Sequence, residues 1–208
     1  MPNKNNKNNK KQLNYWLNNF KYVERNNKFD NLLGKKVWHN LLKNKKIYNV
    51  LECGSNIGRN LKQINLAYPN KKLSFIELNT EAFQICKLNK NIENSHNSSI
   101  ENCKIPRNSY DLVFTSGVLI HLNDQTLKKV IKKMIKWTKK YIIILEYFST
   151  TRIEKEYRGK KGLLFLREYG EEFLKTKKLN LLECGFLYSK IYKKAGFDDV
   201  TYWIFKKK

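Results

Sequence analysis

Hydrophobic positions along the chain follow two alternating patterns. Short apolar runs predict buried strands, and runs with apolar residues three or four positions apart predict amphipathic helices. The predicted strands lie at 47–51, 73–76, 92–95, 111–114, 141–145, 179–187 and 200–205. The helical patterns lie at 13–20, 37–42, 57–64, 82–86, 127–135 and 173–174. This alternation predicts an α/β fold whose sheet is mainly parallel.

The first predicted strand runs into a loop that contains two glycines. Glu52 ends the strand, and residues 54–58 (Gly-Ser-Asn-Ile-Gly) lead into a helical pattern. A loop between a strand and a helix is typical of nucleotide-cofactor sites, although an ordinary turn is the alternative. A dinucleotide site needs a further glycine beside the pyrophosphate. Here Asn56 takes that place and the Glu52 carboxylate repels phosphate, so the loop disfavours a dinucleotide.

The second predicted strand also ends in an acidic residue. Glu77 lies about twenty residues beyond the loop, where a carboxylate can bind both hydroxyls of a ribose. S-adenosylmethionine contains an adenosine but no phosphate, and its sulfonium and ammonium groups are attracted by carboxylates. Glu52 and Glu77 together therefore predict a site for S-adenosylmethionine.

Several further segments match one family of enzymes. They lie at 22–26, 52–61, 76–79, 115–122, 146–149, 157–159, 162–165 and 198–203. Through them the chain resembles the class I S-adenosylmethionine-dependent methyltransferases, and more narrowly the methylases associated with pseudaminic acid biosynthesis. The resemblance implies a Rossmann-like sheet of seven strands, parallel except for one strand near the C-terminus, with helices on both faces.

The expected cofactor-binding residues lie in the loop, at the strand ends and in the N-terminal segment. The resemblance implies that Arg25 binds the methionyl carboxylate, and a surface arginine beside Glu24 is the alternative. Many relatives have an aspartate for the adenine amino group near Ser98 or Ser99, where serine accepts more weakly. The expected set is Arg25, Glu52, Gly54, Ser55, Asn56, Gly58, Glu77, Leu78, Ser99, Ile100, Ser116 and Gly117.

Three residues that follow the fourth and fifth predicted strands are candidates for catalysis. His121 lies in a segment that borders the methyl-transfer site in the resembled family, and its ordinary pKa suits a general base or a group that orients the substrate. A histidine packed between hydrophobic neighbours is the alternative. Glu146 and Tyr147 end the fifth strand. Glu146 is expected to bind substrate or act as a base, or else to pair with a nearby Lys or Arg.

Residues 148–167 lack a clear strand or helix pattern. A long loop in a compact domain usually has a function, and this one follows the fifth strand, so we expect it to be a substrate lid over the methyl group. Its excess of Arg and Lys suits a phosphate or carboxylate on the acceptor. The residues expected to bind the substrate are Tyr157, Arg158 and Asp199.

The composition favours one domain. A chain of 208 residues can bury one ordinary core, and we assign 12–208 to the domain and 1–11 to a disordered, basic Asn/Lys-rich arm. No apolar run reaches 18 residues and no signal-peptide pattern is present, so a cytoplasmic protein is expected. The four cysteines have no C-x-x-C spacing, which favours reduced buried thiols, and no metal site is predicted.

The net charge of +24 favours anionic partners, among which nucleic acid comes first. The lysines are spread along the chain rather than clustered, so a solvated surface is the alternative. The expected activity is methyl transfer from S-adenosylmethionine, with S-adenosylhomocysteine as product, to a hydroxyl or amine of a sugar or nucleotide-linked sugar. An RNA or tRNA methyltransferase and a non-catalytic cofactor-binding module are the alternatives.

Overall fold

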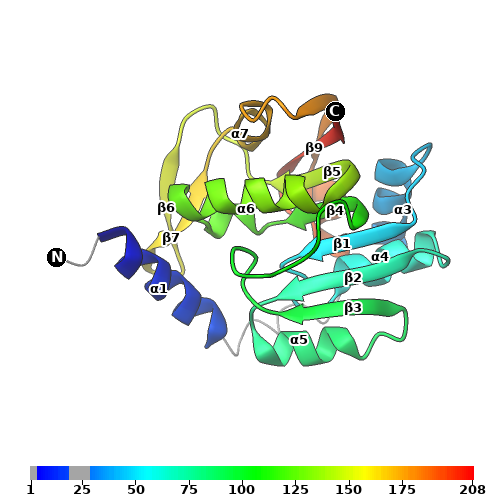
Figure 1. Cartoon of the computed structure of the whole chain (residues 1–208), viewed down its shortest axis with the longest axis horizontal. Helices are drawn as coiled ribbons and strands as arrows, with labels where there is room; N and C mark the ends of the chain where they lie inside the picture. Colours follow the sequence, from blue (N-terminus) through cyan, green and yellow to red (C-terminus); the bar gives the residue numbers. More distant parts are fainter. Residues whose placement is uncertain (1–3, 19–28) are drawn as a thin grey trace.

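The computed structural model of the chain describes residues 4–18 and 29–208, and within them a seven-stranded sheet forms the centre (Figure 1). Its strand order is β3-β2-β1-β4-β5-β9-β8. The strands are β1 (Asn49–Cys53), β2 (Lys72–Glu77), β3 (Ile92–Asn97), β4 (Tyr110–Ser116), β5 (Thr138–Glu146), β8 (Leu179–Leu187) and β9 (Val200–Lys207). Strands β1 to β5 are parallel to one another, and β9 is antiparallel to both β5 and β8. The predicted Rossmann-like sheet with one antiparallel strand near the C-terminus is confirmed.

The strand order reverses between β1 and β4, which lie side by side at the middle of the sheet. The chain moves outward from β1 to β2 and β3, and then returns to add β4 and β5 on the other side. In a doubly wound sheet, ligands bind at the carboxyl ends of the strands beside such a reversal. The loops after β1, β2 and β4 are therefore the positions at which a site is expected.

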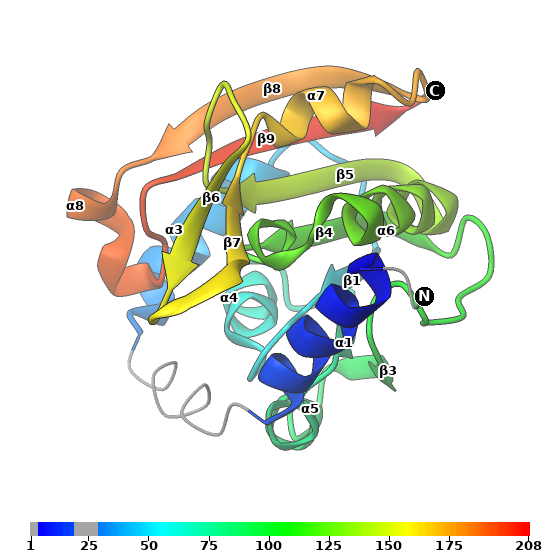
Figure 2. The same ribbon diagram turned by 90° about the vertical axis from the view of Figure 1, so that its left-hand side faces the viewer.

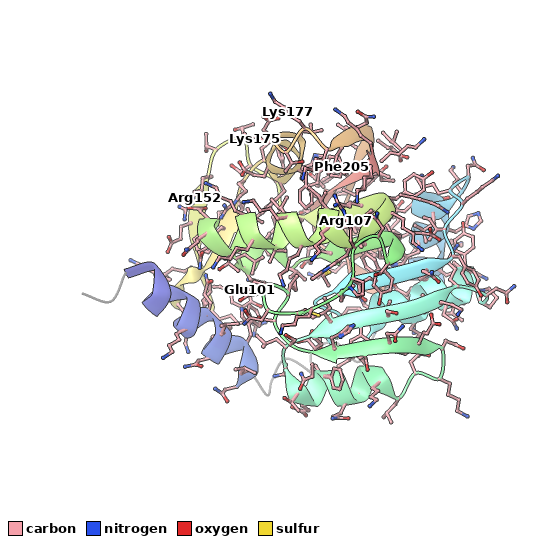
Figure 3. The ribbon with its side chains drawn as sticks, in the orientation of Figure 1. Glu101, Arg107, Arg152, Lys175, Lys177 and Phe205 are labelled. Carbon is pink, nitrogen blue, oxygen red and sulfur yellow. The ribbon has the colours of Figure 1, made fainter. Side chains whose placement is uncertain are left out.

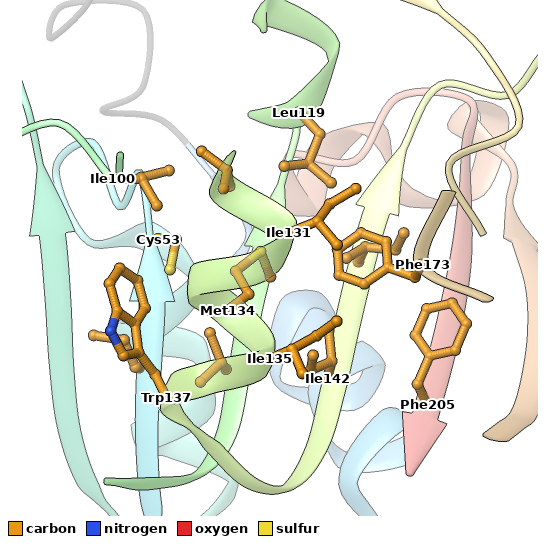
Figure 4. Packing of buried hydrophobic residues seen from close by; sticks show 14 of the residues in the cluster. Cys53, Ile100, Leu119, Ile131, Met134, Ile135, Trp137, Ile142, Phe173 and Phe205 are labelled. Carbon is orange, nitrogen blue, oxygen red and sulfur yellow. The ribbon is translucent and has the colours of Figure 1, made fainter. Parts of the chain in front are cut away.

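Helices cover both faces of the sheet. One buried cluster joins the sheet to α6 and α7, and the other joins it to α3, α4, α5 and η2. Figure 4 shows the first cluster, in which Ile131, Met134 and Ile135 of α6 face the strands and Phe173 packs toward Phe205. The helices are α3 (Asn31–Leu42), α4 (Arg59–Ala67), α5 (Thr80–Lys87), η1 (Leu119–His121), α6 (Asp124–Trp137), α7 (Tyr169–Leu174), α8 (Ser189–Tyr192) and η2 (Lys193–Ala195). None of the described helices is long and apolar enough to span a bilayer.

The N-terminal helix α1 (Lys4–Leu17) lies at the carboxyl ends of the parallel strands (Figures 1 and 2). The expected disordered arm over 1–11 is therefore wrong for residues 4–11. Asparagine is a weak helix former, so composition alone did not predict a helix here. The C-terminal end of α1 is held by Asn79, whose side-chain amide donates to the carbonyls of Trp16 and Leu17 at 3.0 and 3.1 Å. These bonds satisfy carbonyls that a helix end leaves without partners.

The expected loop over 148–167 is instead mainly a β-hairpin, β6 (Ile153–Tyr157) and β7 (Lys160–Leu166). Tyr157 pairs with Lys160, so the turn consists of Arg158 and Gly159, whose φ angles are +55° and +73°. Two central residues with positive φ are the mark of the type I′ turn that suits a twisted hairpin. Strand β6 is mostly exposed, and its polar sequence gives no hydrophobic alternation. That is why the sequence pattern missed it.

Candidate functional site

The loop between β1 and α4 turns tightly over the end of β2. The backbone amides of Gly54 and Ser55 both donate to the carbonyl of Ile76, at 2.8 and 3.2 Å. Gly54 has a φ of +79°, and a Cβ there would lie 2.7 Å from a methyl carbon of Val118. Because both the backbone conformation and the close approach exclude a side chain, this position requires glycine.

The Glu77 carboxylate is held at the end of β2 by two backbone amides. Asn56 N–H donates to one oxygen at 2.7 Å, and Asn79 N–H donates to the other at 2.8 Å. The side chain is buried, and burial raises its pKa. Each oxygen can accept more than one hydrogen bond, so the carboxylate can still accept from a ligand's hydroxyl groups. Glu77 is therefore fixed in place for a ligand that donates two hydrogen bonds.

A pocket with about 770 Å³ of empty space lies beside Glu77, at the carboxyl ends of the central strands. It brings together seven residues predicted from the sequence: Gly54, Glu77, Leu78, Ser99, Ile100, Gly117 and His121. Residues outside the expected set complete its walls: Gln12, Leu13, Trp16, Ile76, Ser98, Glu101, Val118, Leu122 and Thr126. Three of these additional residues belong to α1, so the helix that was expected to be partly disordered covers the pocket.

The pocket contains polar groups suited to an adenosine. The Ser99 hydroxyl is buried, and no described residue is its hydrogen-bond partner. Glu101 also lines the pocket, and Figure 3 shows it on the loop that faces α1. Glu101 therefore adds a carboxyl group to the pocket wall near Ser98 and Ser99, where the sequence has only serine. Its place two residues further along the chain is the reason that it was overlooked.

Glu52 lies beneath the loop rather than in the pocket wall. One of its oxygens accepts from the Asn60 side-chain amide at 2.7 Å, and the other has no partner among the described residues. Burial raises the pKa of Glu52 to about 8. The predicted pair of acidic residues is thus unequal, because Glu77 lines the pocket whereas Glu52 does not.

His121 is the predicted catalytic residue that lines the pocket. Its Nδ1 lies 2.6 Å from the carbonyl oxygen of Leu163 on β7. Because a carbonyl oxygen only accepts, Nδ1 carries the hydrogen and Nε2 has a free lone pair. Burial lowers the pKa of His121 to about 4, so the ring is neutral at physiological pH. The Trp16 ring lies against it, with the ring centroids 4.4 Å apart.

Glu146 holds the turn that presents His121. Its carboxylate is fully buried and accepts from the amides of Val118, Leu119 and Ile120 at 3.1–3.3 Å. Burial raises the pKa of Glu146 to about 7. Both oxygens are directed at the start of η1 instead of the pocket, so the expected base or substrate contact is corrected to a positioning role. Among the described residues no Lys or Arg pairs with Glu146, whose partners are the backbone amides.

The other predicted catalytic and substrate residues lie outside the pocket wall. The Tyr147 hydroxyl donates to Asp198 at 3.1 Å, and its pKa is raised by burial. The Tyr157 ring packs 5.0 Å from His121, and Arg158 lies over Tyr157 at the exposed turn. Asp199 is exposed and accepts from the amide of Ser189 at 2.8 Å. Asp199 therefore stabilises the start of α8, and it does not line the pocket.

The remaining described residues of the predicted cofactor-binding set do not line the pocket. Ser55 and Asn56 belong to the loop, and Gly58 is the N-cap residue of α4, where a Cβ would lie 2.7 Å from the Cys86 sulfur. Ser116 ends β4 without lining the pocket. Arg25 lies outside the described residues. Among the residues that are described, no three His, Cys, Asp or Glu side chains gather as a set of metal ligands.

Comparisons with known proteins agree with this geometry. The family described as "Methyltransferase domain" matches residues 50–141. The chain is 33% identical over 100 residues to phosphoethanolamine N-methyltransferase 3 of Arabidopsis thaliana. That match covers 43% of the chain but spans only 19% of the length of the relative.

Solved structures resemble the whole chain. The Burkholderia thailandensis 1,6-didemethyltoxoflavin-N1-methyltransferase, crystallised with its substrate and S-adenosylhomocysteine, superposes with a TM-score of 0.70 at 11% identity, covering 100% of this chain and 90% of its own. A Leishmania major S-adenosylmethionine-dependent methyltransferase gives 0.71 at 17% identity, with 95% and 82% covered. The plantazolicin methyltransferase with S-adenosylhomocysteine gives 0.65 at 13% identity, with 98% and 99% covered. Residues 50–141 thus match a methyltransferase domain, and the chain as a whole has the fold of the S-adenosylmethionine-dependent methyltransferases.

Proposed function

We propose that this chain is an S-adenosylmethionine-dependent methyltransferase that modifies a small molecule. The observation that carries the proposal is the Glu77 carboxylate, which two backbone amides hold at the pocket beside the Gly54 turn. This is the place at which a doubly wound sheet binds the ribose of a nucleotide cofactor. The match of residues 50–141 to a methyltransferase domain agrees with it.

The pocket residues fit the adenosyl cofactor. Glu77 would accept from the ribose hydroxyls, and the unpartnered Ser99 hydroxyl together with Ile100 would contact the adenine. Gly54 and Gly117 would let the backbone approach the methionyl part, since both have positive φ and line the pocket without a side chain. When bound, the cofactor supplies an electrophilic methyl group on a positively charged sulfur.

The chain's own residues orient the acceptor and exclude water. The free lone pair on His121 Nε2 accepts a hydrogen bond from the acceptor's O–H or N–H, and this directs the acceptor's own lone pair. With a pKa of about 4, the imidazole orients the acceptor more effectively than it removes a proton. Trp16 packs against the imidazole and keeps solvent from that side. Alignment, rather than acid–base chemistry, is thus the main contribution of the site.

We further propose that the acceptor is a hydroxyl or amine of a sugar or nucleotide-linked sugar. The resemblance to the pseudaminic acid-associated methylases supports this class. Positive charge at the hairpin turn is compatible with an anionic acceptor, because Arg158 lies over the Tyr157 ring and Lys160 lies over the Tyr15 ring. Other basic side chains are spread over several sides of the molecule, as Figure 3 shows for Arg107, Arg152, Lys175 and Lys177.

The test combines binding and transfer. The purified chain is titrated with S-adenosylhomocysteine by calorimetry, and is then incubated with methyl-labelled S-adenosylmethionine and a cell extract separated into small-molecule and RNA fractions. Label in a sugar-containing small molecule supports the proposal. Label in RNA, with binding that weakens steeply as salt rises, supports an RNA methyltransferase instead. Cofactor binding without any transfer indicates a binding module, and no binding of either compound contradicts all three.

A further inference from the structure

Strand β7 contains an irregularity beside His121. Regular pairing holds from Ile153–Leu166 to Lys155–Leu164, but the next pair is Tyr157–Lys160. Glu156 of β6 therefore faces three residues of β7, 161–163, where regular pairing would place one. Such a bulge turns backbone groups out of the hydrogen-bond ladder, and bulges are common beside active sites.

Gly162 lies at the centre of this bulge with a φ of +80°. L-amino acids with a Cβ rarely adopt this conformation, and Asn does so most readily among them. A Cβ at Gly162 would meet no atom within 4 Å. The glycine is therefore needed for its backbone conformation and not because space is short.

The bulge directs two successive carbonyls at side chains that line the pocket. The Gly162 carbonyl accepts from the Gln12 side-chain amide at 2.6 Å, and the Leu163 carbonyl accepts from His121 Nδ1 at 2.6 Å. Gln12 in turn accepts from the Asn123 side chain at 3.0 Å. One short stretch of irregular backbone thus holds α1 over the pocket and fixes which nitrogen of His121 carries the hydrogen.

We propose that Gly162 is a positioning residue, whose left-handed backbone forms the bulge that holds α1 through Gln12 and keeps His121 as the Nδ1–H tautomer. The catalytic part of this inference rests on the proposed methyl transfer, because Nε2 is useful only if an acceptor is bound there. The tautomer itself is independent of any reaction.

The chain provides a matched control for substitutions at Gly162. Gly159, at the turn of the same hairpin, has a φ of +73°, and a Cβ there would also meet no atom within 4 Å. Gly159→Ala therefore imposes a comparable backbone strain without touching the bulge. Gly162→Asn keeps a residue that tolerates positive φ and tests whether the conformation is what matters.

The experiment uses the full chain labelled with ¹⁵N-histidine and records long-range proton–nitrogen spectra, which distinguish protonated from unprotonated ring nitrogens. The chain has three histidines, and the His121 signals are identified by their loss in His121→Asn. We expect the Nδ1–H form in the parent, in Gly162→Asn and in Gly159→Ala. Gly162→Ala should lose it in favour of mixed tautomers. In the transfer assay kcat should fall roughly 10-fold for Gly162→Ala alone, because misplacing a group that orients the acceptor costs up to about 10²-fold.

Two results overturn the inference: an Nε2–H form in the parent, or an equal disturbance from Gly159→Ala and Gly162→Ala. Thermal unfolding of both alanine variants shows whether they fold. If Gly162→Ala does not fold, an Nδ1–H form in the parent together with its retention in Gly162→Asn still supports the inference, whereas loss of that form in a folded Gly162→Asn contradicts it. A parent that shows the tautomer but transfers no methyl group contradicts the proposed function and leaves the inference standing.

Discussion

The two sides of the pocket are built differently. On the cofactor side, Glu77 is held by Asn56 and Asn79, residues 21 and 2 positions away in the sequence. On the opposite side, His121 depends on a carbonyl 42 positions away, and Gln12 depends on one 150 positions away. The first side follows from the ends of neighbouring parallel strands. The second side forms only when α1, η1 and the hairpin come together, so it is the side that sequence divergence can change most easily.

Replacing Glu77 by Gln should have the largest effect on cofactor binding. The side-chain oxygen of Gln can accept from the backbone N–H of Asn56 or of Asn79, but its NH₂ group only donates. The other backbone N–H is then buried without a partner. We expect the affinity for S-adenosylhomocysteine to fall about 30- to 100-fold, which corresponds to about 2–3 kcal/mol. Calorimetry measures it. Glu81→Gln, an exposed change in the first turn of α5, is the control and should bind like the parent. Unchanged affinity in Glu77→Gln would remove the basis for the cofactor site.

Replacing His121 by Asn tests the acceptor side of the pocket separately from the cofactor side. The shorter amide side chain of this variant retains a donor for the Leu163 carbonyl but lacks the Nε2 lone pair.

We expect His121→Asn to lower kcat about 100-fold while S-adenosylhomocysteine binds within about threefold of the parent. Steady-state kinetics and calorimetry on the same preparation provide both numbers. His39→Asn, an exposed substitution on α3, serves as the control. A parallel loss of binding and turnover would show that the two sides act as one unit.

Replacing Glu52 by Gln should have the smallest effect, and one that depends on pH. Burial raises the pKa of Glu52 to about 8, so the folded chain holds a proton that the unfolded chain loses near pH 4.5. The stability from this group is therefore fully present below about pH 4.5 and is lost as pH rises through about 8.

Glu52→Gln removes that loss, because the amide stays neutral. The free energy of unfolding of the variant, relative to the parent, should rise between pH 5 and pH 9 by about 1–3 kcal/mol. Urea unfolding at pH 5, 7 and 9 measures it. Glu146 adds a pH dependence of the same sign to both proteins, so only their difference is diagnostic. A constant difference would mean that Glu52 ionises normally.

Much of the fold and of the cofactor side could be predicted from the sequence. The strands show as apolar runs, and Glu52 and Glu77 show where β1 and β2 end. Asn79 lies just after the end of β2 and caps α5, because its side chain accepts from Ala82 N–H. These features are local, and local spacing is what a sequence displays directly.

The other side could not be predicted in the same way. Strand β6 has exposed polar residues throughout most of its length, and α1 is rich in Asn and Lys, so neither has a strong hydrophobic pattern. Glu146 was expected near the chemistry because it ends a strand, but the amides of η1 take both of its oxygens. The sequence reveals that a carboxylate ends the strand, and not which backbone amides will fold back onto it.

Asn79 makes hydrogen bonds to three separate parts of the structure. Its backbone N–H fixes Glu77, its side-chain oxygen caps α5, and its side-chain amide donates to the final carbonyls of α1. The side-chain amide that holds the end of α1 and the backbone N–H that holds Glu77 thus belong to one residue. Any movement of α1 away from the pocket must therefore break hydrogen bonds to the residue whose backbone N–H holds Glu77.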